Sequence, residues 1–179
     1  MGSIAEILKK NIKVIPNFPK KGIMFQDIFS LIGKPRVFSK IILEISKYIK
    51  RNKIKKIVGI DARGFIFGAT LAYKHNIPFV PVRKKGKLPG LVYKKKYKLE
   101  YGYDELEIQK ETINKKDKVL IIDDLIATGG TASATAHLIR KTSDINPHFF
   151  FVIDLYNLGG SLKLKKSGYK VTSLISTEG

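Results

Sequence analysis

The stretch Val119–Thr131, VLIIDDLIATGGT, decides the fold. Its first four residues are uniformly apolar, and two aspartates follow them directly. A run this short and this apolar predicts a strand buried on both faces, as in parallel sheets. The alanine-rich segment Ala132–Arg140 predicts a helix. The order strand, loop, helix indicates an α/β protein.

The loop that follows the strand has almost no side-chain bulk and consists of Ala127, Thr128, Gly129, Gly130 and Thr131. Its glycines let the backbone take left-handed angles and approach a ligand closely. The loop ends at a helix N-terminus, where free N–H groups and the positive dipole end favour an anion. No lysine follows the glycines and there is no GxGxxG, so two common phosphate loops do not fit.

Asp123 and Asp124 stand at the carboxyl end of the predicted strand, where open α/β sheets bind ligands. A 5′-phosphate in the small-residue loop would place a ribose ring against these carboxylates, which accept hydrogen bonds from its hydroxyls. The stretch therefore predicts a ribose-phosphate site. The alternative is an ordinary strand–turn–helix unit with an acidic turn.

Composition limits the class of protein. The chain has 179 residues, which suits one domain with a sizeable core. The absence of cysteine excludes disulfides, thiolate metal sites and a cysteine nucleophile. No apolar run approaches the length that spans a membrane, and the N-terminus lacks a secretory pattern. We expect a cytoplasmic protein with no membrane partner.

The formal net charge of +19 is unusual. Such a balance is found in nucleic-acid-binding proteins. It also occurs on solvated surfaces and in proteins that steer a polyanionic small molecule into a cleft. The excess is mostly lysine spread along the chain in short clusters, which favours surface and steering roles over a nucleic-acid partner.

Periodicity and turn residues predict the remaining elements in chain order. Helices are expected at Ile4–Ile12, after a capping box formed by Ser3 and Glu6, and at Val37–Ile49, Phe65–Tyr73 and Ser161–Lys166. Strands are expected at Lys56–Ile60, Pro78–Val82, Val92–Leu99, Glu105–Ile108, His148–Leu155 and Lys170–Ile175. Prolines and glycine make Val14–Gly22 irregular. No linker interrupts the chain, so one domain is expected over residues 1–179.

Two segments stand out from the α/β pattern. The apolar patch Ile23–Phe25 is either a loop anchored in the core or a hydrophobic wall for a flat ring. The excursion over residues 84–110 contains four tyrosines among lysines. An excursion of this length is usually functional, which favours a lid; a solvated β-arm and a dimer contact are the alternatives.

Five strings together resemble the type I phosphoribosyltransferases, and within them the adenine branch. They are Gly22–Ile28 with Phe18–Pro19 before it, Gly59–Gly68, Arg83–Gly90, Leu99–Gly102 with Glu105–Gln109, and the opening motif. The resemblance covers nearly the whole chain. It implies a central, mostly parallel twisted sheet flanked by helices, with an N-terminal hood in about residues 1–35 that binds the base. It also implies a long flexible lid loop in about residues 84–110.

The resemblance implies that adenine and phosphoribosyl pyrophosphate react to give AMP and pyrophosphate in a homodimer. Mg²⁺ is expected mainly on substrate oxygens, with no metal site made by the protein alone. The leaving pyrophosphate is a polyanion and calls for charge-assisted contacts. By similarity to the family, these contacts come from Arg63, Arg83, Lys84 and Lys87. Gly64, which follows Arg63, is also expected to contact the substrate. Asp123 and Asp124 then hold the ribose, and the small-residue loop holds the 5′-phosphate.

The same resemblance places adenine between Phe25 and Leu125, with backbone contacts from Met24 and Arg63. Glu100 and Tyr101 close over the site on the lid and exclude water. Glu100 is expected to shuttle a proton at the purine; the alternative is that it only orders the closed lid.

One position departs from the family pattern: Ala62 stands where serine is usual. The family's non-proline cis peptide at this point is expected to remain, without a hydroxyl contact to pyrophosphate. Two other functions stay open. One is a phosphoribosyltransferase that uses a 6-oxopurine. The other is a regulator that senses phosphoribosyl pyrophosphate and binds nucleic acid, which the intact lid string disfavours.

Overall fold

The computed structural model describes residues 2–98 and 102–179. Its centre is a seven-stranded sheet in the order β5-β6-β4-β3-β7-β8-β9. The strands are β3 (Lys56–Ile60), β4 (Phe79–Lys84), β5 (Val92–Lys98), β6 (Tyr103–Gln109), β7 (Val119–Ile126), β8 (His148–Leu155) and β9 (Lys170–Thr177). The five strands from β4 to β9 are parallel, and β5 and β6 extend the sheet antiparallel beyond β4. The predicted mostly parallel sheet is confirmed.

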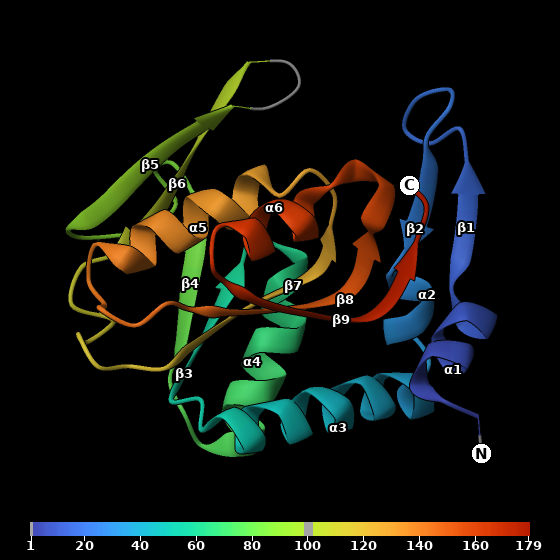
Figure 1. The fold of residues 1–179 in the computed structure, drawn as a ribbon, viewed down its shortest axis with the longest axis horizontal. Coiled ribbons are helices and arrows are strands. Elements are labelled where there is room, and N and C mark those ends of the chain that lie inside the picture. The colour runs from blue at the N-terminus through green and yellow to red at the C-terminus, as the bar shows by residue number, and fades with distance from the viewer. Residues whose placement is uncertain (1, 99–101) are drawn as a thin grey trace.

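Helices cover both faces of this sheet (Figure 1). They are α3 (Pro35–Asn52) and α4 (Arg63–His75) on one face, and α5 (Gly130–Arg140) and α6 (Gly160–Lys166) on the other. A short 3₁₀ turn, η1 (Tyr156–Leu158), precedes α6. The core accordingly forms two clusters, one on each face. Leu120 and Ile122 of β7 join the cluster under α3 and α4, whereas Ile121 joins the one under α5.

The N-terminal hood lies beside the β9 edge of the sheet (Figure 1). It contains α1 (Ile4–Asn11), β1 (Lys13–Pro16), β2 (Met24–Asp27) and α2 (Phe29–Ile32). The predicted capping box of α1 is confirmed, with Ser3 and Glu6 bonded to each other's backbone N–H. The prediction that Val14–Gly22 is irregular was partly wrong, because Val14–Pro16 belong to β1, which pairs antiparallel with β2. Prolines are tolerated there since this two-stranded sheet has only edge strands.

The predicted lid segment, residues 84–110, is mostly regular structure in its described part. Its two predicted strands are present as β5 and β6, which form an antiparallel hairpin, and β6 pairs with the end of β4. Leu106 and Ile108 of β6 are 1% exposed, so the base of the hairpin belongs to the core. The predicted lid residues Leu99, Glu100 and Tyr101 lie outside the residues that the structure describes.

None of the described helices is long and apolar enough to cross a membrane.

Candidate active site

The opening motif has a shorter loop than the sequence suggested. Strand β7 continues through both aspartates to Ile126, and α5 already begins at Gly130. The predicted strand end at Ile122 was wrong, because Asp123 and Leu125 still pair with β8. Carboxylates fit within this strand since it ends at the ligand-binding edge of the sheet. Both aspartates therefore sit on a rigid strand.

A pocket of about 210 Å³ lies at this edge of the sheet. The predicted residues that line it are Arg63, Asp123, Asp124, Leu125, Ala127, Thr128, Gly129, Gly130 and Thr131. Three further lining residues, Ile126, Ala132 and Phe151, were not predicted. Phe151 comes from β8 and is opposite Asp123 in the sheet, so only the strand pairing reveals it. The fold thus brings the motif and Arg63 into one cavity.

The two aspartates have different surroundings. Asp124 is 2% exposed, and its Oδ2 lies 2.7 Å from Nε of Arg63. Burial raises the pKa of Asp124, and the Arg63 guanidinium opposes this rise. Burial raises the pKa of Asp123 well above its ordinary value, and repulsion by Asp124 adds to that rise. The pocket is therefore suited to ligands that donate hydrogen bonds or carry positive charge.

Gly64 explains how α4 reaches the pocket. A Cβ on this residue would lie 2.6 Å from the carbonyl oxygen of Ile122 and 3.1 Å from Oδ1 of Asp123. Only glycine lets the first turn of α4 pack this closely on β7. The peptide bond between Asp61 and Ala62, just before α4, is cis. The resemblance implied this bond, and it is present although alanine replaces the usual serine.

Three predicted basic residues, Arg83, Lys84 and Lys87, gather at the end of β4 and in the turn after it. They are not among the described residues that line the 210 Å³ pocket. Arg83 Nε lies 2.9 Å from Asp61 Oδ2, and Lys87 Nζ lies 4.0 Å from the same atom. Asp61 was not predicted as a site residue. It directly follows the apolar strand β3, just as Asp123 directly follows the apolar run of β7, and this shared pattern could have identified Asp61 from the sequence.

The third basic residue, Lys84, forms an ion pair with Asp104. Oδ2 of Asp104 lies 3.0 Å from Nζ of Lys84, which lowers the pKa of Asp104 and raises that of Lys84. Asp104 was not predicted as a site residue. Its partner is fixed by the pairing of β6 with β4, which local sequence does not show.

The predicted base-binding residues come from two places. Leu125 lines the pocket, whereas Met24 and Phe25 lie on β2 in the hood. Phe25 packs edge-on against Phe18, with ring centroids 5.0 Å apart, and Met24 is 44% exposed. The hood therefore presents the two apolar side chains of Met24 and Phe25, and neither of them lines the pocket in the described part of the chain.

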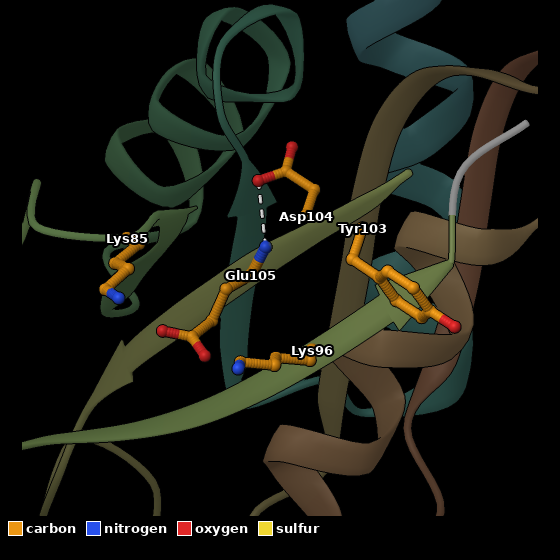
Figure 2. A pocket seen from close by; sticks show the side chains of 5 residues that line it. All are labelled: Lys85, Lys96, Tyr103, Asp104 and Glu105. Atoms are coloured by element: carbon orange, nitrogen blue, oxygen red, sulfur yellow. Dashed lines mark hydrogen bonds between the residues drawn. The ribbon is translucent and has the colours of Figure 1, made fainter. Parts of the chain in front are cut away.

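A larger cavity of about 500 Å³ lies beside the hairpin, and no residue of the motif lines it among those described. Figure 2 shows the side chains that line it: Lys85, Lys96, Tyr103, Asp104 and Glu105. Glu105 extends beside Lys96, its partner across the strands, and Asp104 points to the other side of β6. The smaller pocket is the better candidate, because it combines the buried carboxylate of Asp124, the half-buried one of Asp123, an arginine and a helix N-terminus.

Within the described residues, no group of three or more His, Asp, Glu or Cys side chains is arranged to hold a metal ion. The pocket offers the carboxylates of Asp123 and Asp124, which are the hard oxygen ligands that Mg²⁺ prefers. A magnesium ion fits here if other molecules complete its oxygen shell.

Comparisons with known proteins agree on one family. The model of the phosphoribosyl transferase domain matches residues 34–143. The adenine phosphoribosyltransferase of Shewanella halifaxensis is 48% identical over 173 residues, which are 97% of this chain and 94% of that protein. The Yersinia pestis enzyme of the same name is 45% identical over 172 residues, or 96% of this chain and 92% of that protein.

Solved structures give the same result. The adenine phosphoribosyltransferase of Thermoanaerobacter pseudethanolicus superposes with a TM-score of 0.89 at 41% identity, covering 97% of this chain and 99% of that one. The Saccharomyces cerevisiae enzyme, solved with an imino-altritol bisphosphate and adenine, has a TM-score of 0.87 at 40% identity and covers 96% and 98%.

Proposed function

The chain belongs to the adenine phosphoribosyltransferase family, and from this premise we propose that it converts adenine and phosphoribosyl pyrophosphate into AMP and pyrophosphate. The observation that carries the proposal is the pocket in which the aspartate pair of β7 meets the small-residue loop at the start of α5. The reaction is a pentosyl transfer of purine salvage.

The loop Ala127–Thr131 takes the 5′-phosphate. Gly130 and Thr131 open α5, an eleven-residue helix whose free N–H groups and positive dipole end favour an anion. Asp123 and Asp124 accept hydrogen bonds from the ribose hydroxyls. Their negative charge also suits the cationic ring that develops as the bond between the ribose carbon and pyrophosphate breaks.

The basic residues take the leaving pyrophosphate. Arg63 already lines the pocket, with Gly64 behind it, and Arg83, Lys84 and Lys87 approach from the end of β4 and the following turn. In the structure these cations pair with Asp124, Asp61 and Asp104. A diphosphate carries more charge than a single carboxylate, so it attracts these side chains as strongly as their present partners do.

Adenine binds between Leu125 of the pocket and Phe25 of the hood, with backbone contacts from Met24 and Arg63. A flat purine gains most from apolar faces on both sides. Glu100 and Tyr101 close over the base and exclude water, and Glu100 moves a proton at the purine. All of these base-binding and lid roles are carried over from the family.

Mg²⁺ binds mainly through substrate oxygens, with no metal site made by the protein alone. When bound, the ion neutralises negative charge on the pyrophosphate. We further propose one domain over residues 1–179 that forms a cytoplasmic homodimer, with residues 1–35 serving the base and 84–110 serving as the lid. Sedimentation at micromolar concentration tests the dimer, and a monomer would argue against it.

The decisive assay measures nucleotide formation from each purine base with phosphoribosyl pyrophosphate and Mg²⁺. We expect AMP from adenine at a kcat/KM at least about a hundredfold above those for hypoxanthine, guanine and xanthine. Activity with 6-oxopurines but not with adenine would refute the assignment. No turnover with any base, together with salt-sensitive nucleic-acid binding, would favour the regulator instead.

A further inference from the structure

The segment Arg83–Lys87, which contains the end of β4 and the turn after it, carries three of the four basic residues assigned to pyrophosphate. Arg83 and Lys84 end the strand, and the turn closes with the N–H of Lys87 donating to the carbonyl of Lys84 over 3.2 Å. All three side chains are long and one-third or more exposed. Their aim therefore depends on what fixes the turn itself.

A buried carboxylate on β6 is hydrogen-bonded to this turn. Glu107 is 2% exposed, and its Oε2 accepts a hydrogen bond from the N–H of Gly86 over 2.9 Å. Its other oxygen, Oε1, lies 3.3 Å from Nζ of Lys94 on β5. Glu107 is paired directly with Arg83 across β6 and β4, and with Lys94 across β6 and β5. It thus ties the hairpin to the turn.

A carboxylate in this place needs an explanation, because burying a charge is costly unless it is paired and hydrogen-bonded. The hairpin is already joined to the turn by a backbone bond from the N–H of Lys85 to the carbonyl of Glu105, 3.0 Å long. The side chain of Glu107 adds a charge-assisted bond at the next residue, Gly86, in the middle of the turn. Two consecutive N–H groups of the turn are therefore fixed from β6.

We propose that Glu107 is a positioning residue that fixes the Arg83–Lys87 turn, so that its cations face the pyrophosphate. This inference rests on the proposed function. Glu107 touches no substrate itself. Its loss should weaken binding of pyrophosphate while leaving the base, ribose and 5′-phosphate contacts in place.

The reverse reaction separates these contacts, because AMP carries the base, the ribose and the 5′-phosphate, and pyrophosphate is the other substrate. The variants are Glu107→Gln, which keeps the shape but weakens the bond to Gly86, and Glu107→Ala, which removes it. The matched control is Glu105→Gln, on the same strand, whose side chain lies beside Lys96 in the neighbouring cavity (Figure 2). Thermal melts report whether each variant is folded.

We expect the KM for pyrophosphate to rise about fivefold in Glu107→Gln and about thirtyfold in Glu107→Ala, with the KM for AMP within about twofold of wild type. The control should change neither KM by more than about twofold. Because Glu107→Gln is nearly isosteric, it carries the test if the alanine variant does not fold.

Equal changes in both KM values, or no change in the KM for pyrophosphate in Glu107→Gln, would overturn the inference and leave Glu107 a purely structural residue. A wild-type protein that forms no adenine from AMP and pyrophosphate would instead refute the proposed function, whatever the variants do. The two failures are therefore distinguishable.

Discussion

At the scale of single residues, the aspartate pair combines Asp124, whose carboxylate has an ion-pair partner, with Asp123, whose hydrogen bond comes from the backbone. Asp124 has the Arg63 guanidinium 2.7 Å away. Asp123 accepts the backbone N–H of Asp124 over 2.9 Å, and no ion pair of Asp123 occurs within the described residues. The folded protein thus bears the cost of a partly desolvated charge at the half-buried Asp123. Such a cost is common where function requires a strained or desolvated group.

Asp123→Asn should separate stability from activity. Asparagine keeps the acceptor for the N–H of Asp124 but removes the charge, so turnover should fall about a hundredfold or more. Because folding raises the pKa of Asp123, the wild type loses stability as pH rises from the ordinary carboxyl range to the raised value. The variant lacks this loss and should melt higher at neutral pH, with no advantage in strong acid.

Thermal melts across a pH series and initial rates at neutral pH measure both effects. Asp124→Asn is the matched control, since it leaves Arg63 without its carboxylate and should gain less. A neutral-pH melting temperature of Asp123→Asn at or below that of the wild type would contradict the expected cost of the Asp123 charge.

Sequence reasoning found the residues of the pocket better than it found their partners. Asp123, Asp124 and Arg63 follow from the motifs, and the structure places all three in one cavity. Asp104 and Glu107 were missed because their partners, Lys84 and Gly86, are brought to them by an antiparallel pairing. Such pairing depends on strand register, which short-range patterns do not specify.

At the scale of elements, the phosphate loop is braced from behind by the start of α6. The N–H of Gly160 donates to the carbonyl of Ala127 over 3.0 Å. A Cβ on Gly160 would lie 2.6 Å from the backbone nitrogen of Gly129, which is closer than real side chains approach. Gly160 therefore supports the loop from the start of α6.

Gly160→Ala should push the loop out of place and raise the KM for phosphoribosyl pyrophosphate by about tenfold or more, because the loop loses its fit to the 5′-phosphate. The matched control is Gly168→Ala at the other end of α6. It carries backbone strain from a φ of +83°, but its Cβ would meet no atom within 4 Å. Kinetics with each substrate and thermal melts compare the two variants.

An unchanged KM for phosphoribosyl pyrophosphate in Gly160→Ala would show that α6 does not shape the loop. The same rise in the Gly168→Ala control would assign the effect to general destabilisation.

The elements were predictable where the pattern is local. The apolar runs of β3, β7 and β8 and the periodic face of α3 all appear as expected. The hairpin of β1 and β2 was missed because prolines suggested irregular backbone. The extension of β7 to Ile126 was missed because aspartates normally disfavour strands.

At the scale of the whole molecule, the charge is more one-sided at the surface than composition shows. The chain has 34 Lys and Arg against 15 Asp and Glu. Several of these acids are engaged in ion pairs near the proposed site, among them Asp61, Asp104, Glu107 and Asp124. The remaining surface carries many lysines, and the net charge of +19 gives the molecule a positive field.

This field should speed the arrival of the anionic substrate alone. Phosphoribosyl pyrophosphate carries several negative charges, whereas adenine is neutral. Between low and high salt the Debye length shrinks from about 30 Å at 0.01 M to about 3 Å at 1 M, which screens the surface lysines. We expect kcat/KM for phosphoribosyl pyrophosphate to fall about tenfold from 0.03 to 0.5 M NaCl, and that for adenine to stay within about twofold.

Initial rates, with the other substrate saturating, measure both kcat/KM values, and KCl in place of NaCl checks for ion-specific effects. Parallel declines for the two substrates would mean that salt acts on the fold or the chemical step, and that the +19 charge does not steer the substrate.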